Sequence, residues 1–179
     1  GLEADYLKKS SSLYGHDPHS VVLHPYRSER LYQQNHCGIY RIDRPGEKWV
    51  RIGDNMPADI GDIGFPIAIH PNDPNTIWVF PIDGTEAWSR VCPEGQPAIY
   101  CSKDGGDSWF RQDIGLPMRN AWLTVLRKSL HTDCMVPTGV YFGTTSGSLW
   151  MSDNEGNSWR QIAVHLPRIL AVETGKMLK

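Results

Sequence analysis

Two short polar segments of the sequence contain side chains that could bind a polar ligand or a metal ion. The segments are GHDPHS (15–20) and QQNHCG (33–38). Their candidate residues are His16, Asp17 and His19 in the first segment, and Asn35 and His36 in the second. Imidazole and carboxylate groups are frequent zinc ligands, and a few convergent polar groups of this kind also orient small-molecule ligands.

A metal site built from His16, His19 and His36 would have suitable ligand types. However, the His-x-x-His spacing lies in a predicted loop, where it places no two ligands on one face and carries little specificity. We therefore expect no metal and no other cofactor. We interpret these side chains as candidates for a polar ligand site, with ordinary loop polarity as the alternative.

A second polar group lies in the middle of the chain. Hydrolysis of a glycosidic bond normally requires two carboxylates that face each other across the bond, and Asp62, Asp83 and Glu86 are the weak candidates for such a pair. Trp88 could stack against a sugar ring, and an arginine can bind a carboxylate through two parallel hydrogen bonds. The arginines in question are Arg90 and Arg119.

The elements that would position these residues follow from an internal repeat. Three segments align without gaps, and each ends in tryptophan: IYRIDRPGEKW (39–49), IYCSKDGGDSW (99–109) and LWMSDNEGNSW (149–159). Upstream, VVLHPYRSERLY (21–32) matches IAIHPNDPNTIW (67–78) in the spacing of its apolar residues. His24 and His70 precede proline at equivalent positions, which predicts turn structure. Self-similarity at 50–60 residues indicates a repeat architecture.

Each repeat predicts four short strands separated by turn-forming residues. The strands are expected near 20–24, 30–35, 38–43 and 48–52, near 65–70, 76–81, 98–102 and 108–113, and near 121–127, 139–144, 148–152 and 158–163. The sequence thus predicts an all-β segment, spanning residues 1–179, of three four-stranded antiparallel β-propeller blades at about 18–57, 64–117 and 120–167. Residues 168–175 are expected to form the first strand of an incomplete blade.

The repeated phrase SKDGGDSW has a structural interpretation. Gly106 and Gly156 can adopt the positive φ that a tight hairpin needs. Asp104 can accept backbone N–H hydrogen bonds from its own turn, and the amide oxygen of Asn154 can do the same. The tryptophan that follows can bury roughly 150–250 Å². We expect the phrase to hold the turn between the third and fourth strands of a blade.

The pattern S-x-D-x-G-x-x-W resembles the Asp-box of the bacterial neuraminidase repeat (BNR) proteins. These include sialidases, sortilin-type receptors, xyloglucan hydrolases and a photosystem II assembly factor, all of which are β-propellers. Ser102, Asp104, Gly106 and Trp109 match the full pattern, and Ser152, Asn154, Gly156 and Trp159 match it with one substitution. The stretch from Asp17 to Trp49 also resembles bacterial BNR-repeat proteins of the sialidase-like or glycosyl hydrolase-like kind.

The resemblance has consequences for the extent of the fold. Members of the family usually run to about twice this length, and closed propellers carry about four to eight blades. Three blades would leave apolar faces and unpaired edges exposed. The chain is therefore expected to be the C-terminal half of a larger propeller, a truncated product, or a half that completes the propeller by self-association.

For catalysis, the resemblance to sialidases implies a tyrosine nucleophile, a glutamate base, an aspartate acid and three arginines that grip the substrate carboxylate. Only Arg90 and Arg119 lie on the predicted site face, and no Arg-Ile-Pro segment or tyrosine–glutamate pair can be assigned. The sequence favours a non-catalytic scaffold that binds a carbohydrate, another polar ligand or a protein. The alternatives are a partial or degenerate sialidase-like glycoside hydrolase and, less favoured, an assembly chaperone.

The totals place few limits on partners. The chain has 179 residues, 40% hydrophobic, with a formal net charge of −2, which gives no reason to expect nucleic acid or an anionic membrane. The N-terminal residues contain no apolar leader segment, which favours a cytoplasmic location. The four cysteines form no CxxC pair and are expected to be free thiols, although a bridge between Cys92 and Cys101 stays open.

Overall fold

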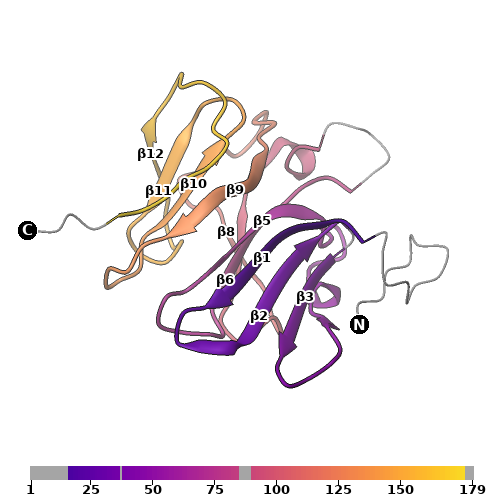
Figure 1. Ribbon diagram of the computed structural model, residues 1–179. Helices are drawn as coiled ribbons and strands as arrows, with labels where there is room; N and C mark the ends of the chain where they lie inside the picture. The colour runs from indigo at the N-terminus through magenta and orange to yellow at the C-terminus, as the bar shows by residue number, and fades with distance from the viewer. Residues whose placement is uncertain (1–15, 37, 85–89, 176–179) are drawn as a thin grey trace, which may run out of the picture.

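Three antiparallel sheets of four strands make up the structure (Figure 1), a computed structural model that describes residues 16–36, 38–84 and 90–175. The first sheet contains β1 (Pro18–His24), β2 (Arg27–Asn35), β3 (Gly38–Asp43) and β4 (Val50–Arg51). The second contains β5 (Gly64–Ile69), β6 (Ile77–Pro81), β7 (Ile99–Ser102) and β8 (Phe110–Gln112). The third contains β9 (Val125–Thr132), β10 (Val140–Thr144), β11 (Leu149–Ser152) and β12 (Arg160–Ala163).

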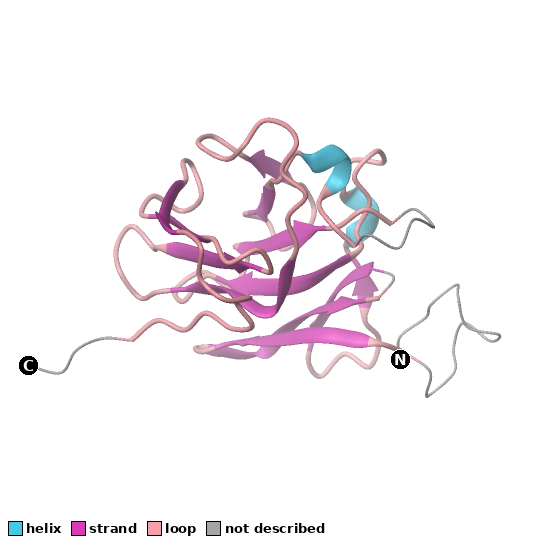
Figure 2. Cartoon of the chain, turned by 90° about the horizontal axis from the view of Figure 1, so that it is seen from above, coloured by secondary structure: helices cyan, strands magenta, loops and turns pink. Residues whose placement is uncertain are grey.

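Each sheet is a simple meander, in which every strand pairs with the next one along the chain. Short turns make this order possible, since antiparallel neighbours can be joined by tight loops. Among the described residues, helical structure is confined to two short 3₁₀ turns outside the sheets, η1 (Gly53–Asn55) and η2 (Pro93–Gly95) (Figure 2). Within the described ranges, no helix has the length and apolar character needed to cross a membrane.

The first strands of the three sheets, β1, β5 and β9, lie side by side (Figure 1). They line a common groove of about 220 Å³. Because each sheet starts at this groove and runs outward, the sheets are blades around one axis, which is the arrangement of a β-propeller. The expected all-β propeller segment is therefore confirmed.

The middle sheet is covered on both faces, and its sequence reflects this. All five residues of β6 are buried, including Trp78 and Phe80. One buried cluster joins the first and second sheets through residues such as Tyr32, and the other joins the second and third sheets through residues such as Phe142. Strands buried on both faces are near-continuously apolar, so the composition of β6 follows from its central position.

The two corner segments, 102–109 and 152–159, have the same internal hydrogen bonds. In the first, the hydroxyl of Ser102 accepts from the N–H of Gly106 at 2.7 Å and donates to Asp104 at 2.8 Å. The N–H of Ser108 donates to Asp104 at 2.9 Å. Gly106 has φ = 102°, and a Cβ there would meet the side chain of Ile52, so glycine is required for both conformation and packing.

The second corner segment repeats this network with an amide in place of the carboxylate. Ser152 donates to the Oδ1 of Asn154 at 2.8 Å and accepts from the N–H of Gly156 at 2.8 Å. The N–H of Ser158 donates to the same oxygen at 3.0 Å. The interpretation of the repeated phrase as turn structure is confirmed, and an acceptor oxygen is the feature that both corner segments need.

The tryptophan that ends each corner segment ties its sheet to the preceding one. The indole N–H of Trp109 donates to the carbonyl of Ile52 at 3.2 Å, and that of Trp159 donates to the carbonyl of Gln112 at 3.2 Å. Both carbonyls lie at or just after the last strand of the previous sheet. Trp49 belongs to the first sheet, which has no preceding sheet among the described residues.

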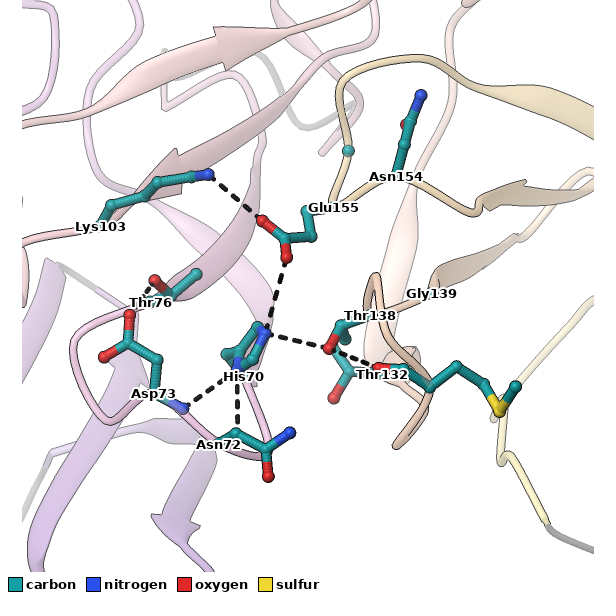
Figure 3. A network of polar contacts seen from close by, with 12 residues as sticks. His70, Asn72, Asp73, Thr76, Lys103, Thr132, Thr138, Gly139, Asn154 and Glu155 are labelled. Carbon is teal, nitrogen blue, oxygen red and sulfur yellow. Dashed lines mark hydrogen bonds and ion pairs between the residues drawn. The ribbon is translucent and has the colours of Figure 1, made fainter.

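His24 and His70 have the turn role that their position before proline predicts. The Nδ1 of His70 accepts from the N–H groups of Asn72 and Asp73, both at 3.0 Å, and the Nδ1 of His24 accepts from the N–H of Tyr26 at 3.2 Å. Since its Nδ1 is an acceptor, neutral His70 carries its proton on Nε2, which lies 2.9 Å from the hydroxyl of Thr138 in the third sheet (Figure 3). His70 therefore also joins two blades.

Two local expectations differ from the structure. The first strand of the third sheet lies at Val125–Thr132, later than expected, because residues before it bond to loops, as Ala121 does to Gly95. Residues 168–175 form a single parallel bridge, Lys128–Ala171, because no strand pairs with their other edge in the described chain.

Cys92 and Cys101 are free thiols, as the sequence predicts, and the bridge between them that the sequence left open is not formed. Burial raises the pKa of both thiols, that of Cys101 to about 12.

The corner network generates a stability prediction. Asp104→Ala should lower the free energy of unfolding by about 1–2 kcal/mol because the Ser102 and Ser108 donors lose their acceptor. Asp104→Asn should cost less than about 1 kcal/mol, because Asn154 makes the equivalent bonds in the third sheet. Urea denaturation measures both, with exposed Asp153→Asn as the control. Equal losses in Asp104→Ala and Asp104→Asn would contradict the network.

The same residue predicts a pH dependence. Burial acts to raise the pKa of Asp104, but hydrogen bonds from Ser108 and Ser102 outweigh it and lower the pKa. The charged form is thus favoured in the folded state. Its stabilisation is present above the unfolded pKa of about 4 and is lost as the pH falls through the folded value. Because Asp104 is exposed, the effect should be small, and it should be absent from denaturation curves of Asp104→Asn.

The free face of the first sheet supports the prediction of self-association. Val21 and Leu23 lie on the inner strand β1 and are 48% and 51% exposed. Two copies would supply twice the three sheets of one chain, within the range of closed propellers. We expect light scattering to show a dimer that dissociates on dilution and is weakened in the double variant Val21→Thr, Leu23→Gln. Ile114→Thr, also exposed, should behave as the native chain, and a monomer at every concentration would exclude self-association.

Candidate functional site

The loops at one end of the three sheets bring together most of the described candidate residues. The start of β1 and the end of β2 lie next to each other, and the N–H of His36 donates to the carbonyl of Asp17 at 2.9 Å. The start of β5 is also close, since the Nδ1 of His19 lies 2.6 Å from the carbonyl oxygen of Gly64. This end lies opposite the corner segments, as the sequence predicts.

Asp17, His19 and His36 form a compact cluster. The Oδ2 of Asp17 lies 3.2 Å from the Nε2 of His19 and 3.5 Å from the Nδ1 of His36. The His19 side chain is 1% exposed, whereas those of Asp17 and His36 are 55% and 34% exposed. The cluster therefore has one buried side chain, His19, and two side chains that are accessible to solvent. His16 lies next to Asp17 in sequence but outside this cluster.

The surroundings of His19 favour its neutral form. Burial lowers its pKa, and the charge of Arg127 acts in the same direction, while the contacts with Gly64 and Asp17 oppose the shift. The ring of His19 also lies against Phe65, with 4.8 Å between ring centroids. A buried imidazole in this setting keeps a lone pair on one nitrogen at neutral pH.

Asn35, at the end of β2, has an unusual environment. The residue is completely buried, and neither polar atom of its side chain makes a hydrogen bond within the described part of the chain. Buried polar groups normally have partners, because leaving one unsatisfied costs about 1–3 kcal/mol. Its amide is therefore a candidate to bind a buried water or a ligand group.

A pocket of about 460 Å³ lies at the same end, beside the third sheet. Three arginines line it, and they come from distant parts of the chain: Arg90, Arg127 and Arg168. Its other described lining residues are Phe65, Thr124, Leu126 and Thr145, so none of them is acidic. We call this site the arginine pocket.

Hydrogen bonds at Thr124 fix the segments that carry the pocket. The hydroxyl of Thr124 donates to the carbonyl of Arg90 at 2.8 Å, and its own carbonyl accepts from the N–H of Thr145 at 3.0 Å. Next to Arg168, the N–H of Ile169 donates to Thr144 at 3.2 Å. The backbone of Arg90 is thus held by a hydrogen bond to Thr124, and the backbone next to Arg168 is held by the bond from Ile169.

Phe65 connects the arginine pocket with the Asp17–His19–His36 cluster. One neighbour of its ring is His19, and the guanidinium of Arg127 lies 5.1 Å from its centroid. A cation over an aromatic face is attracted by the ring quadrupole. The contact holds Arg127 at the pocket wall, where the described lining residues include no acidic side chain.

The sequence missed two of the three arginines. Arg127 falls at the end of the strand expected at 121–127, but it lies near the start of β9 and therefore at the loop end of the sheet. Arg168 was assigned to an incomplete strand. If β9 is placed correctly at Val125–Thr132, Arg127 lies near its start and therefore at the site end. Nothing in the sequence pairs Arg168 with it.

The remaining candidates do not come together. Arg119 is exposed and does not line the arginine pocket. Glu86 and Trp88 lie outside the described residues. Asp62 is 10% exposed and accepts two hydrogen bonds from Arg51, at 3.0 and 3.1 Å, which raise the pKa of Arg51 above its ordinary value.

The geometry of Asp62 indicates a structural role rather than an acid or base. Its backbone carbonyl also accepts from the side-chain amide of Gln34 at 2.9 Å. Both carboxylate oxygens of Asp62 are engaged by the guanidinium fork of Arg51, which holds the side chain in a structural contact. The acid/base pair considered from the sequence is therefore reduced to Asp83 within the described chain, and a single carboxylate is insufficient for the usual glycosidase mechanism.

Known structures share the fold of this chain. It is similar to the GH74 xyloglucanase from Xanthomonas campestris, with a TM-score of 0.63, 22% identity and coverage of 82% of this chain and 20% of the other. A GH74 enzyme from Niastella koreensis is also similar, with a TM-score of 0.65 and 20% identity. The match covers 86% of this chain and 22% of the enzyme. The structure of YCF48 bound to D1 peptide has a TM-score of 0.50 and 13% identity, and the match covers 86% of this chain and 43% of YCF48.

These similarities establish the propeller fold alone, because all identities lie below 25%. The chain spans about a fifth of the length of the GH74 enzymes that it matches. No family model matches the chain, and no curated protein matches it.

The Arg51–Asp62 pair gives a testable prediction. Asp62→Asn should lower the free energy of unfolding by about 1–3 kcal/mol, because Arg51 loses a charged, largely buried acceptor. Asp54→Asn is the matched control, since exposed Asp54 also contacts Arg51 but should contribute about 0.5 kcal/mol or less. Chemical denaturation measures both changes. Equal stability of Asp62→Asn and the native chain would contradict the structural role.

Proposed function

We propose that this chain is a non-catalytic propeller scaffold that binds a carboxylate-bearing ligand, such as an acidic sugar, in the arginine pocket. The observation that carries the proposal is the convergence of Arg90, Arg127 and Arg168 on one pocket whose described lining has no acidic residue. The ligand class follows from the chemistry of the guanidinium group.

Charge supports an anionic ligand. Three like charges in one pocket repel one another, at about 1 kcal/mol for a pair 4 Å apart even in water and more near a protein surface. An anion bound between them would relieve this repulsion. Guanidinium groups match the geometry of a carboxylate and can bind both of its oxygens.

The other lining residues support a small organic ligand rather than a simple ion. Phe65 and Leu126 supply apolar surface, while the hydroxyls of Thr124 and Thr145 can hydrogen-bond to a polar substituent. Ligand pockets typically combine apolar walls with a few convergent polar groups. The volume of about 460 Å³ would accept a monosaccharide-sized molecule.

The proposed function does not include hydrolysis, because the described carboxylates are not arranged as a catalytic pair. Asp62 is bound to Arg51, and the arginine pocket has no carboxylate among its described lining residues. A glycosidase of the usual kind needs two such groups on either side of the scissile bond. A sialidase-like hydrolase stays the alternative function that activity measurements can identify.

Isothermal titration with N-acetylneuraminate and glucuronate tests the proposal, with glucose as the neutral comparison. We expect binding of at least one acid and none of glucose, and a loss of affinity of about tenfold or more in Arg127→Gln or Arg168→Gln. Arg119→Gln is the matched control, because Arg119 is exposed outside the pocket. Affinity should fall as salt rises.

Three outcomes would contradict this function. Binding of neither acid would remove the ligand class, and equal loss in Arg119→Gln would place the site elsewhere. Turnover of a fluorogenic sialoside, abolished by Asp83→Asn, would replace the scaffold with the hydrolase alternative. Far-ultraviolet circular dichroism on each variant separates loss of binding from loss of fold.

A further inference from the structure

The Asp17–His19–His36 cluster has a donor geometry that a sequence reading could not supply. Histidine spacing alone pointed to His16, His19 and His36, but the structure replaces His16 with the carboxylate of Asp17. The three ligand atoms all lie within 4.8 Å of one another. They come from the residue before β1, from β1 itself and from the residue after β2.

The hydrogen bonding of His19 fixes where its proton lies. Its Nδ1 lies 2.6 Å from the carbonyl oxygen of Gly64. Because a carbonyl can only accept, Nδ1 must carry the hydrogen. In the neutral imidazole the lone pair is then on Nε2, the atom that faces Asp17. A histidine that binds a metal usually donates its other N–H to a carbonyl or carboxylate in this way.

The contact between His19 and Asp17 then needs a cation. The Nε2 of His19 and the Oδ2 of Asp17 lie 3.2 Å apart, and in the neutral state both are acceptors. Two acceptors at this distance repel each other unless a proton or a metal ion lies between them. The competing explanation is therefore a protonated His19 in a simple ion pair.

The two distances to the Asp17 oxygen are close to those of a metal site, and the two histidine nitrogens lie within 4.8 Å of each other. With zinc–ligand bonds of about 2.0–2.2 Å, two ligand atoms of a tetrahedral site lie about 3.3–3.5 Å apart. The cluster shows 3.2 Å from Asp17 to His19 and 3.5 Å from Asp17 to His36. Ion pairs of Asp17 with protonated imidazoles are the competing explanation for both distances.

We propose that Asp17, His19 and His36 form a binding site for a divalent transition-metal ion of the zinc type. Two imidazole nitrogens and one carboxylate oxygen suit zinc, whereas calcium and magnesium prefer oxygen ligands. The buried His19 anchors the ion, and the two more exposed side chains admit it from solvent.

Charges around the site act in both directions. Arg127 lies beyond Phe65 and raises the electrostatic cost of a cation at His19. The carboxylate of Asp17 is in direct contact and offsets this charge. Asp17 is therefore expected to control the affinity for the metal ion, because its removal would leave two imidazole ligands and no negative charge to offset the charge of Arg127.

Calorimetric titration of the metal-free, untagged chain with zinc chloride tests the site. We expect one zinc ion per chain and a loss of affinity of about tenfold or more in Asp17→Asn and in His36→Ala. His165→Ala, which removes an exposed histidine outside the cluster, is the matched control and should bind as the native chain does. Magnesium at millimolar concentration should not compete.

Two further measurements test the site in the native chain, so that a variant that does not fold cannot decide the result. Nitrogen chemical shifts should place the proton of His19 on Nδ1 without zinc and should show a change at Nε2 when zinc is added. Zinc should also raise the unfolding temperature of the native chain but not that of Asp17→Asn. Absence of saturable one-to-one binding, or equal binding by Asp17→Asn and His36→Ala, would overturn the proposal and leave an ion pair.

Discussion

The contact that the rest of this structure depends on is the one between the tryptophan of each corner segment and the last strand of the preceding sheet. Trp109 and Trp159 each place a large indole between two blades and donate its N–H to a carbonyl of the earlier one. A sheet buries only one face against its neighbour, so four-stranded blades need such contacts to hold their relative position. The serine and aspartate or asparagine of the corner segments set the turn from which the tryptophan enters.

This constraint separates the two ends of the blades. At the corner end, side chains bond to backbone within a blade or to the next blade, as His70 does with Thr138. At the opposite end the loops also carry the two proposed sites, which have different chemistry and lie on either side of one aromatic ring. Phe65 separates them, with His19 and Arg127 both in contact with its ring.

The proximity of the proposed cation site to the proposed anion site would have a physical consequence. A bound metal ion would add positive charge beside Arg127 and would strengthen the field that attracts an anion to the arginine pocket. A bound anion would in turn lower the cost of the metal. Coupling of this kind is reciprocal by thermodynamic necessity. It requires no movement of the blades, since the two sites interact through space and through the fixed ring of Phe65.

Local pattern in the sequence was sufficient for the architecture. The tryptophan-terminated repeat located three four-stranded sheets, and the corner glycines and acceptor side chains specified their turns, because turn chemistry and strand alternation are short-range properties. The site was recoverable only in part. Asp17, His19 and His36 could be grouped because they flank two paired strands, but which atoms meet depended on the contact of His19 with Gly64 in the next blade.

The arginine pocket was beyond the reach of the sequence. Arg90 lies between β6 and β7, Arg127 lies in β9, and Arg168 lies after β12, so no spacing rule connects them. Only the closure of the blades around one axis brings them together. The sequence by itself determined the repeating unit, since that depends on neighbours along the chain. Tertiary structure decided which charges share a pocket, because that depends on how blades pack through space.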